Sequence, residues 1–203
     1  MLLISLAILA RIVDDKESIS LSKALRHHLF STIEPKKEVT VADVLSYEQP
    51  TKYIVSNTEY SDNKDLTPVL TANKAFILGY TEETNGVYDK GPCIILDDFT
   101  LDSKIVDFPF KVKSSAIKIL SAKTLVNLRY IYEYLKFLDL NTEEHKRHYI
   151  AEIESMTIEL PDDGTIQSIA GLFERIDQRR KGLERDLQLL KSQKDYLLLA
   201  IFI

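Results

Sequence analysis

The chain has 203 residues, of which 45% are hydrophobic and 28% are charged, as in an ordinary soluble globular protein. A net charge of −5 argues against a uniformly basic nucleic-acid coat, although a local basic surface remains possible. The single cysteine, Cys93, excludes an internal disulfide and fits a reducing, cytoplasmic compartment.

The chain begins with an apolar stretch, residues 1–13, that raises the question of membrane targeting. No basic residue precedes the apolar run and Arg11 interrupts it, whereas a signal peptide places its positive charge first and a membrane span needs about 20 apolar residues. We therefore expect no membrane association. Residues 16–33 predict a helix with an apolar stripe, and we assign residues 1–37 to an N-terminal helical segment. The stripe comprises Leu21, Ala24, Leu25, Leu29 and Phe30.

The middle of the chain, residues 38–160, has the pattern of a compact α/β domain. Short runs rich in β-branched and apolar residues predict strands, and polar stretches with glycine and asparagine between them predict loops. Residues 125–138 predict a helix. The expected strands are residues 53–55, 68–70, 75–78, 93–96 and 116–120.

The C-terminal segment, residues 161–203, predicts a long helix with Thr165 as its N-cap. Its apolar residues recur at alternating steps of three and four, which is a coiled-coil pattern, and the helix would be roughly 58 Å long at 1.5 Å per residue. Only Arg180 and Lys194 interrupt the seam. So narrow a seam needs a second helix, although packing against the chain's own domain is the alternative. The residues expected to pair are Ile169, Phe173, Ile176, Leu183, Leu187, Leu190 and Leu197.

Several blocks in series resemble the target-recognition domain of the specificity (S) subunits of type I restriction–modification systems. They are TPVLTANK (67–74), ILGYT (77–81), IILDDFT (94–100) and VDFPFKVKSSA (106–116), followed by Arg147-His148-Tyr149 and Leu160-Pro161. Several ordered blocks are far more specific than one short motif. The helical tail is similar to the helical spacer of the same family.

The resemblance implies a non-catalytic subunit without a cofactor or metal. Such subunits read double-stranded DNA and dock modification (methyltransferase) and restriction subunits. Family members usually carry two recognition domains, each reading half of a bipartite site, and two long antiparallel helices. This chain has one domain and one complete helix, so it is similar to a half-length S subunit. A second half chain, or a second copy in a homodimer, would restore the paired helices.

Candidate DNA-binding residues follow from local charge and residue type. Residues 100–129 contain six basic side chains against Asp102 and Asp107, the clearest positive excess in the chain. The six are Lys104, Lys111, Lys113, Lys118, Lys123 and Arg129. We expect phosphate contacts from Lys104, Lys111, Lys113, Ser114 and Ser115, and base or groove contacts from Asn73, Lys74, Tyr80, Thr81 and Asn85.

Two other functions are kept as alternatives. Asp98 followed by Asp102-Ser103-Lys104 supplies the residue types of a Mg²⁺-dependent nuclease, a pattern that is common by chance. A coiled-coil assembly adaptor without DNA reading would account for the heptads but would leave the middle blocks unexplained.

Overall fold

A computed structural model describes residues 15–71, 75–123, 127–139 and 152–201. The chain divides into two compact units, one made of residues 1–33 and 167–203 and the other of Glu34–Ile166. Helices form the first unit, and strands with short helices form the second. The expected α/β architecture with a long C-terminal helix and a shorter N-terminal helix is confirmed.

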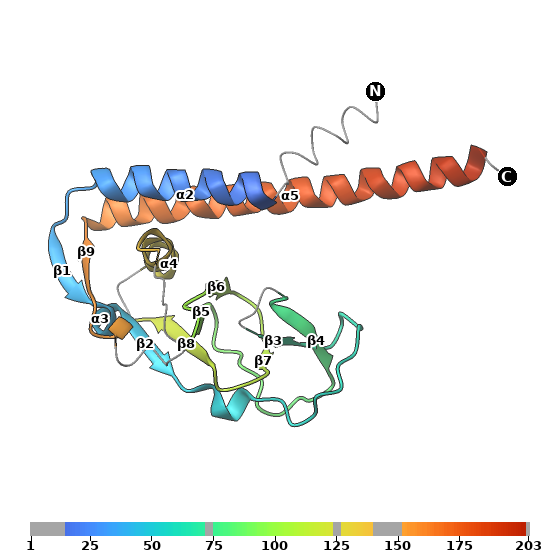
Figure 1. Cartoon of the computed structure of the whole chain (residues 1–203), viewed down its shortest axis with the longest axis horizontal. Coiled ribbons are helices and arrows are strands. Elements are labelled where there is room, and N and C mark those ends of the chain that lie inside the picture. The colour runs from blue at the N-terminus through green and yellow to red at the C-terminus, as the bar shows by residue number, and fades with distance from the viewer. Residues whose placement is uncertain (1–14, 72–74, 124–126, 140–151, 202–203) are drawn as a thin grey trace. The chain divides into compact units, whose positions relative to one another are not determined.

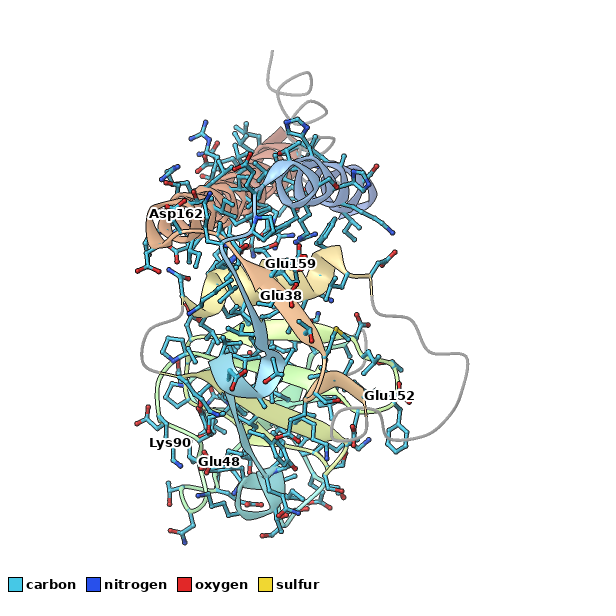
Figure 2. All side chains as sticks on the ribbon, turned by 90° about the vertical axis from the view of Figure 1, so that its left-hand side faces the viewer. Glu38, Glu48, Lys90, Glu152, Glu159 and Asp162 are labelled. Atoms are coloured by element: carbon cyan, nitrogen blue, oxygen red, sulfur yellow. The ribbon has the colours of Figure 1, made fainter. Side chains whose placement is uncertain are left out.

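The helical unit pairs α2 (Asp15–Thr32) with α5 (Asp163–Ile201), which lie side by side (Figures 1 and 2). The guanidinium of Arg26 on α2 lies 5.5 Å from the ring centroid of Phe173 on α5, so the two helices are in direct contact. Ile169, Phe173 and Leu187 are buried on α5, and Phe30 is buried on α2.

The apolar stripe expected on the N-terminal helix is wrong at Leu21, which is 73% exposed, and at Ala24, which is also exposed. Leu25 and Leu29 are partly buried as expected, and Arg26 is partly buried as well. The buried face therefore includes the stem of an arginine, which covers apolar surface as long charged side chains often do. Within the described residues, no helix carries an apolar run that could cross a bilayer.

The second unit contains three small sheets. An antiparallel sheet has the order β2 (Leu45–Glu48), β8 (Ile117–Ala122), β5 (Cys93–Asp97) and β6 (Ser103–Val106). A second sheet has the order β4 (Ile77–Thr81), β3 (Thr67–Leu70) and β7 (Lys111–Val112), and its β3–β7 pair is parallel. A third sheet pairs β1 (Lys37–Thr40) with β9 (Thr157–Leu160). The helical elements of this unit are α3 (Val41–Val44), the 3-10 helix η1 (Pro50–Tyr53) and α4 (Leu128–Phe137).

One hydrophobic core joins the two larger sheets. Tyr88 stacks on Phe110 at a centroid distance of 4.9 Å and meets the edge of Tyr53 at 5.3 Å. Buried aliphatic side chains from β3, β5, β6, β7 and β8 surround these rings. Because strands of both sheets contribute to it, this core fixes the loops at their ends relative to each other.

The long helix begins three residues earlier than expected, at Asp163. The carboxylate of Asp162 accepts hydrogen bonds from the backbone N–H of Thr165 at 2.9 Å and from its hydroxyl at 2.8 Å. Asp162 is therefore the cap, and Thr165 stands at the third helical position. Both residue types cap helices well, so the sequence alone does not decide between them.

Residues 53–55 are not a regular strand. Tyr53 ends η1, and Ile54 forms an isolated parallel bridge with Val112. The chain therefore has a single extended contact with β7 at this point, and this contact helps to position the loops described next.

Candidate nucleic-acid interface

Three extended segments leave the second sheet at the same edge, because β3, β7 and the Ile54 bridge all run parallel. The N–H of Lys113 donates to the carbonyl of Leu70 at 2.9 Å, and the N–H of Val55 donates to the carbonyl of Val112 at 3.0 Å. The chain continuations therefore emerge together. We call this region the loop edge; it comprises residues 56–57, 75–76, 83–86 and 113–116.

Glu83 brings the β4–β5 loop to this edge. Its Oε1 accepts hydrogen bonds from the backbone N–H groups of Ser56 at 2.9 Å and Asn57 at 3.0 Å. The Asn57 N–H contributes most to a lowered pKa of the Glu83 carboxyl, and Lys111 adds to it. Two loops that are distant in sequence are thus tied by one carboxylate.

Lys104 reaches the loop edge from β6. Its ammonium lies 4.7 Å from the ring centroid of Phe76, a cation–π contact that leaves the side chain half-exposed. Phe76 is itself held in place, because its carbonyl accepts a hydrogen bond from the N–H of Thr71 at 2.8 Å. Lys104 is thus placed beside the residues that follow β3.

The turn between β7 and β8 contains three of the residues for which phosphate contacts are expected. Lys113 and Ser114 are exposed, and Ser115 is half-exposed. The Ser114 hydroxyl accepts a hydrogen bond from the Ala116 N–H at 3.4 Å, which shapes the turn. The exposed Asn85 lies in the loop that Glu83 anchors, so the loop edge gathers five of the expected residues: Asn85, Lys104, Lys113, Ser114 and Ser115.

The other expected residues are not part of this group. Tyr80 and Thr81 pair with Pro68 and Thr67, the first two residues of β3. Thr81 is buried and its hydroxyl accepts the N–H of Glu83 at 3.2 Å, so its side chain is used inside the protein. Asn73 and Lys74 lie outside the described residues.

The positive excess of residues 100–129 does not form one surface, which corrects the expectation from the sequence. Lys118 is buried and pairs with the buried Asp98 at 3.1 Å, and Arg129 pairs with the buried Glu133 at 2.6 Å. Lys123 donates to the carbonyl of Ala42. Of the six basic residues, only Lys104 and Lys113 are available at the loop edge.

Lys111 likewise has a different place from the one expected. Its side chain is only 3% exposed, and its ammonium lies 3.1 Å from a carboxylate oxygen of Glu83. A buried ammonium that is already paired cannot contact a phosphate on the surface, so the expected phosphate role of Lys111 is corrected to an internal one.

The residues of the nuclease alternative are divided among different partners. Asp98 is held by Lys118, and Asp102 lies 3.4 Å from Lys136. Lys104 covers the Phe76 ring. In the described ranges, no three His, Cys, Asp or Glu side chains are grouped as a metal site. This arrangement offers no shared position for a metal-bound water.

An ionic cluster around Glu48 lies in the second unit, Glu34–Ile166, which we call the head, and no sequence pattern indicated it. The carboxylate of Glu48 accepts from Lys52 at 2.7 Å, from Lys90 at 2.8 Å and from the Tyr53 hydroxyl at 2.7 Å. Figure 2 shows Glu48 and Lys90 close together. The cluster ties the end of β2 to η1 and to the β4–β5 loop, and so limits how that loop can move.

This cluster predicts a stability loss in acid. Partial burial alone would raise the pKa of Glu48, but hydrogen bonds from Lys52, Lys90 and Tyr53 outweigh it and lower the pKa to about 2. A lowered pKa stabilises the fold above the unfolded value of 4.5, and this stabilisation is lost as the pH falls from there towards 2. We expect the loss to be about 1–2 kcal/mol, because the lysines are exposed and screened.

Urea denaturation of the wild type and of Glu48→Gln across this pH range measures the effect. The variant should be less stable near neutral pH, and the difference should vanish at the acid end. Parallel curves for the two proteins at every pH would contradict the assignment.

Comparison with known proteins gives one sequence relative and several structural ones. No protein-family model matches the chain. The chain is 40% identical over 171 residues to the type I restriction enzyme EcoR124I/EcoR124II specificity subunit of Escherichia coli. The match covers 77% of this chain and 42% of the relative, so the chain spans less than half the length of that protein.

Two solved structures share the fold at low sequence identity. The type I restriction–modification S subunit from M. genitalium superposes with a TM-score of 0.65 at 16% identity, covering 97% of this chain and 58% of that one. The HsdS subunit from Thermoanaerobacter tengcongensis superposes with a TM-score of 0.53 at 14% identity, covering 97% of this chain and 56% of that one. At these identities the likeness concerns the fold.

Proposed function

The chain belongs to the specificity subunits of type I restriction–modification systems, and from this we propose that it recognises a DNA sequence, reading one half of a bipartite target. The observation that carries the proposal is the 40% identity over 171 residues to a specificity subunit. The loop edge supports it, because exposed amide, hydroxyl and ammonium groups gather there on loops held by a rigid core.

Within this proposal the phosphate contacts come from Lys104, Lys113, Ser114 and Ser115, and Asn85 lies where it can reach a base edge. An asparagine side chain pairs with adenine in the major groove, and lysine and serine suit the backbone. Asn73 and Lys74 remain candidates on sequence grounds. Thr81 and Lys111 are removed from the interface, and Tyr80 is secondary to the five residues of the loop edge.

The helical unit is proposed to dock the modification and restriction subunits and to pair with a second half-specificity chain or a second copy. α5 has 39 residues and α2 has 18, so α2 cannot accompany α5 along its whole length. Near the far end of α5, Leu189, Tyr196, Leu197, Leu198 and Leu199 are exposed. Several large apolar side chains exposed near one end of a helix are typical of a surface that a partner covers.

We propose that the chain has no catalytic chemistry of its own. The nuclease alternative lacks convergent carboxylates, since Asp98 and Asp102 have separate lysine partners. The adaptor alternative accounts for the helices but gives the loop edge no role.

A selection experiment tests the proposal. The chain is purified with its modification subunits and exposed to duplexes that contain a randomised stretch, and the retained DNA is sequenced. A short enriched motif is the expected result. Salt-sensitive retention without a motif would contradict sequence recognition, and a complex that retains no DNA would favour the adaptor. Cleavage of the pool by the chain with Mg²⁺ would favour the nuclease.

A further inference from the structure

The Lys111 ammonium on β7 is one of the few buried charged groups among the described residues of the head. Lysine is almost never fully buried unless it is paired, yet the side chain of Lys111 is only 3% exposed. Its ammonium has three acceptors: Glu83 Oε2 at 3.1 Å, the Asn85 carbonyl at 2.5 Å and the Gly86 carbonyl at 3.3 Å. These match its three donors, and all belong to the β4–β5 loop.

Glu83 extends the connection to a second loop. While Oε2 receives Lys111, Oε1 accepts the N–H groups of Ser56 and Asn57. The Lys111–Glu83 pair thus fixes the positions of two loops, residues 56–57 and the β4–β5 loop. The β4–β5 loop carries the exposed Thr84 and Asn85. The backbone that carries those two side chains is held by Lys111, which binds Glu83 and the Asn85 carbonyl.

Gly86 shows how closely the loop is fitted. Its φ of +63° is in the left-handed region, and a Cβ at this position would overlap the carbonyl oxygen of Lys52. The loop therefore rests directly on η1, and Lys111 fixes it from the other side. With both supports in place, the backbone at Asn85 has little freedom.

A buried ion pair is weak grounds for stability, because apolar side chains of similar volume often serve as well. Such a pair does impose one geometry, since each partner left alone would be a buried unpaired charge. We propose that Lys111 and Glu83 are positioning residues that set the DNA-reading loops, so that they govern which sequence is bound without touching DNA. This inference rests on the proposed function.

The test compares the affinity for a duplex carrying the selected motif with the affinity for a scrambled duplex, at several salt concentrations, using the complex with modification subunits. In Lys111→Met the affinity for the motif should fall about tenfold to a hundredfold, the range of one or two lost base contacts. Affinity for the scrambled duplex and the salt dependence should not change, because no phosphate contact is lost.

Glu83→Gln and the double variant Lys111→Met with Glu83→Gln complete the test. If the two residues act only through their contact with each other, all three variants should lose a similar fraction of the discrimination between the motif and scrambled duplexes. Glu83→Gln keeps an acceptor oxygen for the backbone and provides a reading if Lys111→Met fails to fold. The matched control is Glu133→Gln, which breaks the buried Arg129–Glu133 pair on α4. It should reduce stability but leave the discrimination intact.

Each other outcome has a separate meaning. A wild type that does not discriminate between duplexes refutes the proposed function. Full discrimination in folded Lys111→Met or Glu83→Gln refutes the positioning role. An equal loss on both duplexes with a shallower salt dependence would show that Lys111 contacts a phosphate, and would also refute it.

Discussion

Phe173→Ala should lower the free energy of unfolding of the helical unit by about 3–5 kcal/mol, the usual cost of removing a buried phenylalanine. Phe173 is 2% exposed, and its ring is covered by the Arg26 guanidinium of α2. The substitution removes apolar contacts and leaves a space between the two helices. Denaturant titration followed by helical circular dichroism measures the change.

Leu189→Ala is the matched control for this prediction. Leu189 lies on the same helix but is 63% exposed, so its loss should change stability by no more than about 0.5 kcal/mol. Equal effects of the two substitutions would show that Phe173 does not join α2 to α5.

Reversing the two available lysines of the loop edge should weaken DNA binding strongly. In Lys104→Glu with Lys113→Glu, two proposed phosphate contacts are replaced by repulsive charges. We expect the affinity for every duplex to fall about tenfold to a hundredfold. The slope of the logarithm of the binding constant against the logarithm of the salt concentration should become less steep by about 2. Fluorescence anisotropy with the motif and scrambled duplexes, repeated over a salt series, measures both quantities.

Lys36→Glu with Lys37→Glu makes the same change of net charge elsewhere on the head, where both residues are exposed. This control should bind DNA almost as the wild type does. If the two double variants weaken binding equally, the effect comes from overall charge and the loop edge has no special role.

The helices and the fold class were largely accessible from the sequence. Apolar periodicity identifies a helix because its buried face is local information, and the expected seam residues Ile169, Phe173 and Leu187 are buried in the structure. Their pairing with a partner chain remains a prediction, as do the domain boundaries. The prediction that Leu21 is buried was wrong, because burial depends on which residues of the second helix face it, and the sequence of one helix does not show this.

The site was less accessible, for a physical reason. A lysine in a basic stretch looks the same whether it faces solvent or an acid from a distant segment. Lys111 meets Glu83 and Lys118 meets Asp98, and each contact exists only after the sheets have formed. The hydrogen bonds from Ser56 and Asn57 to Glu83 likewise join residues that are 27 and 26 positions apart, so no local sequence pattern indicates them. By contrast, Lys113, Ser114 and Ser115 are exposed because they form a turn, which the polar composition favours.

Amide hydrogen exchange of the complex with modification subunits tests the central claim, that this edge of the head reads DNA sequence. The exchange is measured with the selected duplex and with its scrambled form. We predict additional protection by the selected duplex at residues 56–57, 83–86 and 113–116. Protection confined to β1 and β9, or identical protection by both duplexes, would contradict it.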